Sequence, residues 1–320
     1  MTFLEFLNEF TPIYIALVGI LGLMVGSFLN VVIYRLPVMM EREWQMGWQH
    51  YEQERREAAQ QDQEQSLTGN GTNQSGHAGA IESTPEAQSP TAERFNLAVP
   101  KSRCPSCGTA IQAWQNIPVV SYLWLGGKCA ACKTTISIRY PLVEAFTALL
   151  SMVCAIKFGV SIEALSALVI TWCLVALSGI DFDTQLLPDS ITLPLLWLGL
   201  LASLVPVFAN TSEAIIGAAA GYMSLWLVYW AFKLLTGKEG MGFGDFKLLA
   251  ALGAWFGWQA LPMIILLSSV VGAIVGITLI VVKGRDKQIP IPFGPYLAAA
   301  GWLSMILGEQ LSAYYFNLYV

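Results

Sequence analysis

Two aspartates beside apolar stretches are the residues of this sequence best suited to chemistry. Asp245 closes a Gly-Phe-Gly-Asp segment (residues 242–245) beside one long apolar stretch, and Asp181 stands at the end of another. An ionisable group at bilayer depth is costly, so its presence there indicates a functional site. Two carboxyl groups, one ionised and one protonated, suit the attack of water on a peptide bond. The sequence therefore predicts a catalytic aspartate dyad, against the simpler interpretation of two solvated helix ends.

Neighbouring acidic residues must be separated from this pair. Asp183 is expected in a solvent-exposed turn, whereas Asp181 lies nearer the apolar run and is more desolvated, which favours a carboxyl group that keeps its proton. Asp189 follows Pro188 at the start of the next apolar stretch, a position typical of a helix cap. Glu144 is expected in the first turn of a helix, where a carboxylate suits the helix dipole.

Four cysteines form two closely spaced pairs, Cys104 with Cys107 and Cys129 with Cys132. Each pair has two residues between its thiols, and a 21-residue spacer separates the pairs, slightly more than in the usual zinc ribbon. Such pairs place four thiolates for tetrahedral zinc, and a fully protein-ligated ion is structural. The alternatives are disulfides or free thiols, and a reducing cytosol argues against disulfides.

The composition indicates a membrane protein, because 55% of the residues are hydrophobic and only 12% are charged. A soluble domain carries about 25% charged residues. The first apolar stretch is too long for a signal peptide and follows acidic residues, so we expect a retained span. Eight stretches are long enough, or nearly so, to cross a bilayer. They are residues 12–34, 142–158, 162–180, 191–208, 214–235, 246–258, 261–282 and 295–311, of which the sixth is short.

The basic residues orient these stretches. With eight spans and an external N-terminus, Lys157 alone among the 17 Lys and Arg residues falls on the external side. The fold class predicted is an all-α polytopic membrane protein with about eight transmembrane helices and a cytosolic zinc-binding domain between the first two. Both termini then face the periplasm, and Asp181 and Asp245 both reach the cytosolic side.

The domain organisation follows from this topology. Residues 1–36 are the first transmembrane helix, 37–140 the cytosolic domain with a four-cysteine zinc module at 101–135, and 141–320 the transmembrane bundle that carries the dyad. Residues 40–59 predict a charged helix. Residues 60–92 are rich in Gln, Ser, Gly and Thr, cannot bury enough apolar surface to fold, and predict a disordered insertion.

Two further interpretations stay open on the residues alone. Gly242 and Gly244 either permit close helix packing or let a substrate backbone approach Asp245. Embedded aspartates also occur in proton-coupled transporters, where they line an ion path. A third possibility, a zinc-binding membrane scaffold without chemistry, leaves the Gly-Phe-Gly-Asp segment unexplained.

Several segments together resemble the bacterial type IV prepilin peptidases, also called prepilin leader peptidase/N-methyltransferases, of the GxGD class of membrane aspartic proteases. The resemblance covers nearly the whole chain outside the polar insertion, and its motifs are specific in combination. It is carried by residues 26–37, both cysteine pairs, 181–189, 242–245 and the Pro-Phe-Gly-Pro-Tyr segment at 292–296.

This resemblance implies a function. Asp181 and Asp245 match the family's catalytic aspartates, which cleave prepilins and pseudopilins at the cytosolic face of the inner membrane. The family's second activity transfers a methyl group from S-adenosylmethionine to the new N-terminal amine, and Gly127 and Lys128 match a segment linked to it. The partners implied are these substrates and membrane lipid, with no nucleic acid.

Overall fold

The computed structural model describes residues 9–68, 95–238, 240–283 and 291–317. Regular structure in these ranges is helical, apart from two isolated β-bridges, so the all-α prediction is confirmed. The chain forms two compact units, one of Met1–Tyr34 with Ser102–Val320 and the other of Arg35–Lys101. The first unit therefore holds the cysteines together with the apolar helices, whereas the sequence had grouped them with residues 37–100.

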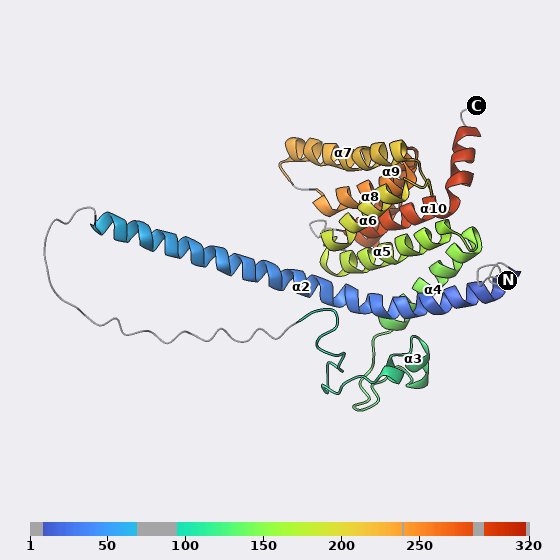
Figure 1. The fold of residues 1–320 in the computed structure, drawn as a ribbon, viewed down its shortest axis with the longest axis horizontal. Helices are drawn as coiled ribbons and strands as arrows, with labels where there is room; N and C mark the ends of the chain where they lie inside the picture. Colours follow the sequence, from blue (N-terminus) through green and yellow to red (C-terminus); the bar gives the residue numbers. More distant parts are fainter. Residues whose placement is uncertain (1–8, 69–94, 239, 284–290, 318–320) are drawn as a thin grey trace. The chain divides into compact units, whose positions relative to one another are not determined.

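The first described helix is much longer than expected. Helix α2 runs without interruption from Thr11 to Thr68 and passes through Pro37 (Figure 1). It joins the predicted first span to the charged helix at 40–59 and continues into the segment expected to be disordered. Gln and Glu are good helix formers, and no glycine or proline occurs between Gly47 and Gly69, which explains the extension. Residues 69–92 of that segment lie outside the described ranges.

Within the second unit, Arg35 is the main polar contact. Its guanidinium is buried and donates hydrogen bonds of 2.7–3.3 Å to the carbonyls of Asn96, Leu97 and Pro100. Arg42 lies over the Phe95 ring, 4.2 Å from its centroid. These contacts hold residues 95–100 against the middle of α2.

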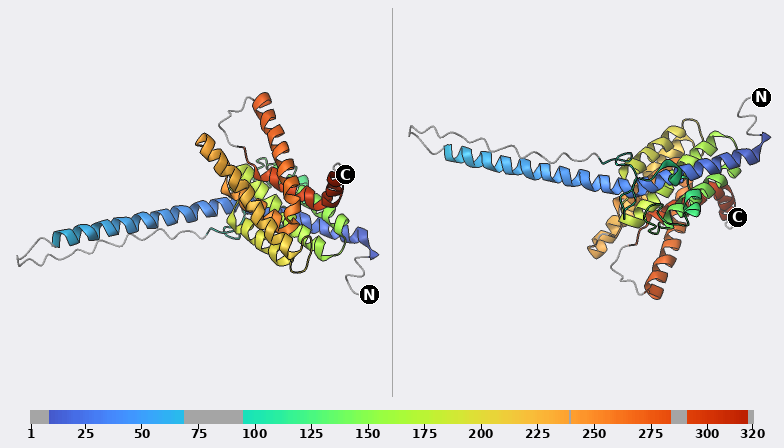
Figure 2. Two further views of the ribbon diagram at one scale, coloured as in Figure 1. Left: turned by 90° about the horizontal axis from the view of Figure 1, so that it is seen from above. Right: turned by 90° about the horizontal axis from the view of Figure 1, so that it is seen from below.

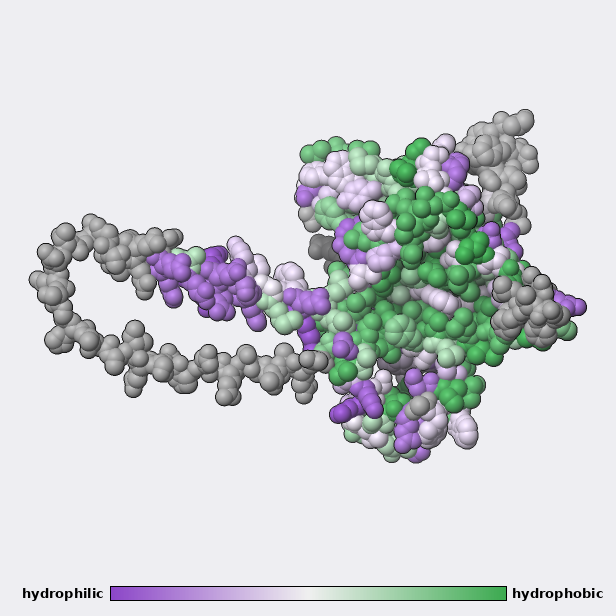
Figure 3. Space-filling model, viewed as in Figure 1, coloured by the Kyte–Doolittle hydropathy of each residue, from purple (hydrophilic) through white to green (hydrophobic). Residues whose placement is uncertain are grey.

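Each of the eight predicted apolar stretches coincides with a helix. The helices after α2 are α4 (Arg139–Phe158), α5 (Ile162–Thr184), α6 (Asp189–Ala202), α7 (Thr211–Thr236), α8 (Phe243–Phe256), α9 (Leu261–Lys283) and α10 (Gly294–Asn317). Among the described residues, five segments, in α2, α4, α5, α7 and the α9 region, are long and apolar enough to cross a membrane. We call α4 to α10 the helical bundle. Its surface shows broad hydrophobic areas (Figure 3). Among its exposed apolar side chains are Leu234 and Val281, which are 80% and 76% exposed.

Helix α8 is the core of the bundle, although it has only 14 residues. It contacts α6, α7 and α10 (Figures 1 and 2), and Phe246, Leu248 and Leu249 are fully buried. A helix that is apolar all round is expected to be enclosed by other helices. Its approach to α7 is unusually close. A Cβ on Gly217 of α7 would collide with the carbonyl oxygen of Gly253 of α8, so only glycine allows this crossing.

Candidate active site

Asp181 lies in the last turn of α5. Ser161 caps the start of this helix by accepting a 3.0 Å hydrogen bond from the Ala164 N–H, and Gln185 ends it in a left-handed conformation. The Asp181 side chain is only 5% exposed. Its Oδ2 accepts a buried hydrogen bond of 2.9 Å from the backbone N–H of Gly294, the first residue of α10. The carboxylate is thus held between two helices that are far apart in sequence.

Asp245 lies in the first turn of α8, three residues after the N-cap Gly242. It is 7% exposed, and its backbone N–H donates a hydrogen bond of 3.3 Å to the Gly242 carbonyl. Its Oδ1 is buried and, among the described residues, is the one such side-chain oxygen or nitrogen without a hydrogen-bond partner. Buried polar atoms are nearly always paired, so an unpaired carboxyl oxygen marks a position prepared for a proton, a water or a substrate.

Leu187, in the loop after α5, links the two aspartate segments. A Cβ on Gly244 would lie 2.7 Å from Leu187 Cβ, and a Cβ on Gly294 would lie 3.1 Å from Leu187 Cδ2. One leucine therefore touches both the residue before Asp245 and the residue that binds Asp181. The structure thus brings the two predicted residues into one neighbourhood.

These contacts bear on the two interpretations of the glycines. A glycine is required at position 244 because the Leu187 side chain packs against it. Leu187 belongs to a loop, so this contact is not the helix packing of the first interpretation. At Gly242 the nearest atom to an added Cβ is Asp245 Oδ2, at 3.8 Å, which is ordinary van der Waals contact. The Cβ direction is therefore open at Gly242 and filled by Leu187 at Gly244.

Two ion pairs flank the aspartates. Asp183 pairs with Arg139 at 2.7 Å, with both side chains partly exposed, so its charge is already matched. Asp189 pairs with Lys247 at 2.6 Å. The predicted capping role of Asp189 is wrong, because Pro188 holds the N-cap position and Asp189 is the first helical residue. Its carboxylate is used in tertiary pairing with α8.

Glu144 also differs from its predicted role. Helix α4 begins at Arg139, so Glu144 lies beyond the first turn, where a dipole interaction is weak. The side chain is buried, and Oε2 accepts a 2.7 Å hydrogen bond from the backbone N–H of Val119. Val119 has a positive φ of 58°, which is unfavourable for a β-branched residue. Glu144 thus ties the segment between the cysteine pairs to α4.

The four cysteines form one cluster, as predicted. Their Sγ atoms all lie within 4.8 Å of one another, and those of Cys104 and Cys132 are 3.7 Å apart. Tetrahedral Zn–S bonds of about 2.3 Å require sulfur separations of roughly 3.8 Å, so the residues fit this ion. The Thr134 hydroxyl lowers the pKa of the Cys132 thiol to about 6, which favours the thiolate that a metal needs.

The two cysteine pairs are built alike. In each pair, the N–H of the first cysteine donates a hydrogen bond to a threonine carbonyl. The residue that directly follows the second cysteine has a positive φ, 69° at Gly108 and 60° at Lys133. An isolated β-bridge closes each loop. We call residues 102–135 the four-cysteine module.

Gly127 and Lys128 lie just before the second cysteine pair. Gly127 has a φ of 69°, its N–H bonds the Tyr122 carbonyl at 2.9 Å, and its carbonyl accepts from the Ile136 N–H at 2.7 Å. Both backbone groups of Gly127 are therefore used within the module. The Lys128 side chain is exposed.

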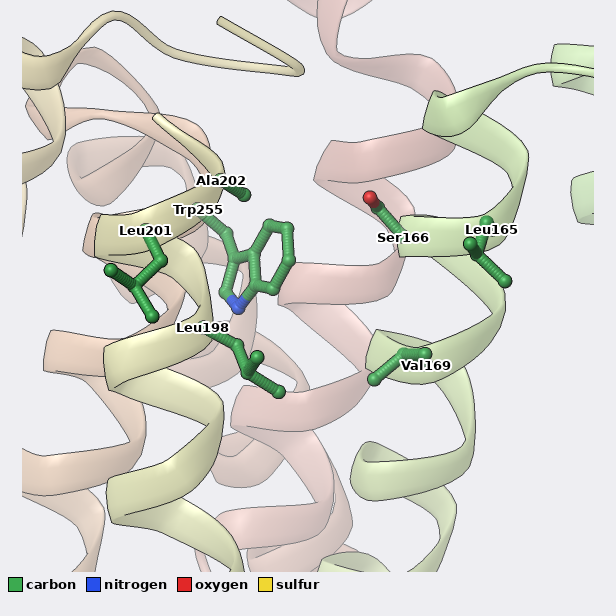
Figure 4. A pocket seen from close by; sticks show the side chains of 7 residues that line it. All are labelled: Leu165, Ser166, Val169, Leu198, Leu201, Ala202 and Trp255. Carbon is green, nitrogen blue, oxygen red and sulfur yellow. The ribbon is translucent and has the colours of Figure 1, made fainter. Parts of the chain in front are cut away.

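An apolar crevice of about 360 Å³ opens between α5, α6 and α8 (Figure 4). It is separate from the aspartates, because its α5 residues lie at least 12 positions before Asp181, or roughly 18 Å along the helix. Its lining is formed by Leu165, Ser166, Val169, Leu198, Leu201, Ala202 and Trp255.

Sequence reasoning gave no role to Leu187 or Gly294, which complete the aspartate neighbourhood. Gly294 lies within the Pro-Phe-Gly-Pro-Tyr segment that was noted only as part of a resemblance. The signal in the sequence was a glycine directly before a proline at a helix start. This glycine lies in a segment that carries the same family resemblance as the two aspartate segments.

Comparison with known proteins finds two family matches along the chain. Residues 20–158 match the bacterial peptidase A24 N-terminal domain, and residues 168–277 match the type IV leader peptidase family. A protein of Aeromonas salmonicida named prepilin leader peptidase/N-methyltransferase is 50% identical over 314 residues, 98% of each chain. Proteins with the same name from Pseudomonas aeruginosa (49%, 98% of each chain) and Neisseria gonorrhoeae (47%, 95% of this chain and 94% of the relative) are similar to it as well.

No solved structure matches the chain. The matched family regions cover most of its length and contain both aspartates and all four clustered cysteines. Two of these relatives, from Aeromonas salmonicida and Pseudomonas putida, are 50% identical over 98% of this chain and over 98% and 97% of their own lengths. The chain therefore belongs to the type IV leader peptidase family.

Proposed function

We propose that this protein is a membrane aspartic endopeptidase that removes the leader peptide of type IV prepilins and pseudopilins. The observation that carries the proposal is the buried pair of Asp181 and Asp245, which come from two helices and whose segments both contact Leu187. The chain is also 50% identical to a protein named prepilin leader peptidase/N-methyltransferase. The comparisons give no support to the transporter alternative.

The proposed reaction uses the two carboxyl groups as an acid–base pair. One ionised aspartate takes a proton from water as the water oxygen attacks the scissile carbonyl carbon, and the protonated aspartate donates to the carbonyl oxygen. The unpaired Oδ1 of Asp245 supports this chemistry, because a carboxyl oxygen there has no competing partner in the described part of the protein.

The topology we propose has eight membrane spans in the inner membrane, with a cytosolic four-cysteine module and both termini in the periplasm. Five segments of suitable length and hydropathy support a multi-pass protein. Helices α6 and α8 have 14 residues each, or roughly 21 Å, which is shorter than the hydrocarbon core of about 30 Å. They would cross the membrane only if water reaches the aspartate site at one of their ends. A site near the cytosolic face is where such water is available for hydrolysis.

A structural zinc ion is proposed for the four-cysteine module, held by the four clustered thiolates. The ion would supply folding energy to a module that has little apolar core of its own. Four protein ligands leave no position for a reacting water, so hydrolysis is assigned to the aspartates.

Methylation of the new N-terminal amine, with S-adenosylmethionine as methyl donor, is the second proposed activity. It rests on the names of the relatives and on the matching residues Gly127 and Lys128. The backbone N–H and carbonyl of Gly127 are both hydrogen-bonded within the protein, so Gly127 would contribute by forming the turn that presents the exposed Lys128 side chain.

The test compares three asparagine variants of purified protein on a prepilin, with and without the methyl donor, by mass spectrometry. Asp181→Asn and Asp245→Asn should each abolish leader removal. Asp183→Asn is the matched control, because Asp183 lies two residues from Asp181 but is half-exposed and paired with Arg139. It should retain cleavage. Cleavage by either of the first two variants would remove that residue from the mechanism.

A further inference from the structure

Gly294 makes a backbone contact that joins α10 to the proposed dyad. Its N–H donates to Asp181 Oδ2 at 2.9 Å across 113 residues of sequence, and the bond is buried. Because Gly294 is the first residue of a 24-residue helix, its N–H belongs to the positive end of the helix dipole. A hydrogen bond donated to a carboxylate stabilises the ionised form.

The space around Gly294 makes this contact specific to glycine. A Cβ at this position would lie 2.7 Å from Asp181 Oδ2 and 3.1 Å from Leu187 Cδ2. The first distance is below what real Cβ atoms show, so any other residue must displace the carboxylate or the start of α10. At Gly242, by contrast, an added Cβ would be 3.8 Å from Asp245 Oδ2.

The two aspartates differ in their remaining oxygen. The Asp181 carboxylate accepts the Gly294 backbone N–H, whereas the bond between Asp245 and Gly242 is made by the backbone, from the Asp245 N–H to the Gly242 carbonyl. Asp245 Oδ1, however, is buried and has no hydrogen-bond partner among the described residues. Neither carboxylate oxygen of Asp181 is both buried and without a hydrogen-bond partner. An ionised Asp245 would leave a charged oxygen in a dry site, which is more costly than leaving a protonated one there.

We infer that Gly294 is a positioning residue that holds Asp181 as the ionised base of the dyad, so that Asp245 is the acid. This rests on the proposed peptidase function and adds the assignment of the two roles. Four charged side chains at this end of the described helices form two ion pairs, Arg139 with Asp183 and Lys247 with Asp189. None of these four groups supplies an unmatched charge that would reverse the assignment.

The assignment gives a balanced reaction. Asp181 accepts a proton from the attacking water, whose oxygen bonds to the carbonyl carbon, and Asp245 gives its proton to the carbonyl oxygen. When the C–N bond breaks, Asp181 passes its proton to the leaving amine. The hydroxyl proton of the intermediate returns to Asp245, and both residues recover their starting states.

The experiment measures kcat and KM for prepilin cleavage across pH in the full-length enzyme and in Gly294→Ala. Because a misplacement of about 1 Å can lower the rate roughly 100-fold, kcat should fall by that order with little change in KM. The acidic limb of the kcat profile should also move to higher pH, since Asp181 is protonated more easily without its donor. Gly308→Ala on the same helix is the control, because nothing lies within 4 Å of a Cβ there.

A second variant covers the case in which Gly294→Ala does not fold, as judged by its melting transition. Replacing Gly294 by glycolic acid exchanges the N–H for an ester oxygen and adds no bulk. The same shift of the acidic limb is expected. A wild-type kcat and pH profile in the folded alanine variant, or in the ester variant, would overturn the inference. If the wild-type enzyme does not cleave, or if either Asp→Asn variant does, the proposed function itself fails instead.

Discussion

Gly217→Ala tests how the bundle holds α8, the helix that carries Asp245. Helix propensity alone predicts that this substitution stabilises the folded protein, because alanine is more favourable than glycine by about 1 kcal/mol in a helix interior. The structure predicts the opposite sign. The added Cβ would meet the carbonyl oxygen and carbon of Gly253, and these backbone atoms cannot rotate away as a side chain can.

The magnitude follows from two opposing contributions. Overpacking a well-packed contact costs about 1–3 kcal/mol, and a backbone obstacle belongs at the upper end of that range. Subtracting roughly 1 kcal/mol for the better helix propensity leaves a net destabilisation of about 1–2 kcal/mol. For a unit of this size, that corresponds to a melting temperature lower by about 2–8 °C.

Thermal melting in detergent measures the effect, with Gly47→Ala as the matched control. Gly47 lies in α2, and a Cβ there meets nothing within 4 Å, so this variant should melt at the wild-type temperature or above it. Gly217→Ala should also lower prepilin cleavage, because Asp245 lies eight residues, or roughly 12 Å, before Gly253 on the same rigid helix. A Gly217→Ala protein that melts at or above the wild-type temperature would refute the reasoning.

Three further predictions concern the four-cysteine module. Removal of zinc by a chelator should unfold the module and expose residues 102–135 to protease, and unchanged protease resistance would argue against a structural ion. Glu144→Ala should lower the melting temperature, because the half-buried Val119 N–H then lacks this acceptor at a cost of about 1 kcal/mol, while Glu144→Gln should cost less; equal effects would contradict this. Lys133→Gly should relieve a left-handed residue by roughly 1 kcal/mol, as Gly108 already does in the other loop, and slow zinc transfer to a chelator. Faster transfer would count against it.

The parts of the site that the sequence predicted are those whose signal is local. Asp181 and Asp245 stand out because a charge beside an apolar stretch is rare and costly, and the four cysteines stand out because their spacing alone limits their geometry. Helix positions were also predictable from apolar runs. The assignment of Asp181 over Asp183 depended on a difference in desolvation, and the structure has Asp181 buried and Asp183 paired with Arg139.

The parts that the sequence did not predict depend on contacts between distant segments. Glu144 and Asp189 both looked like residues that stabilise a helix start, since that is the commonest local role of an acidic residue there. Their partners, Val119 and Lys247, lie 25 and 58 residues away. The boundary of α2 was missed for another reason. Its second half is polar, and polarity alone does not distinguish a solvated helix of good helix formers from a disordered segment.

The scaffold must impose the geometry of the dyad, because two carboxyl groups repel each other whenever both are ionised. In this structure the constraint comes from contacts that only glycine permits. Gly253 holds α8 against α7, Gly244 admits Leu187 beside Asp245, and Gly294 brings the start of α10 onto Asp181. The first contact fixes α7 relative to α8, the second fixes the loop after α5 relative to α8, and the third fixes α10 relative to α5, so no single one can replace another. A chain with the same apolar pattern and both aspartates, but with side chains at these three glycines, would form the helices and misplace the carboxyl groups.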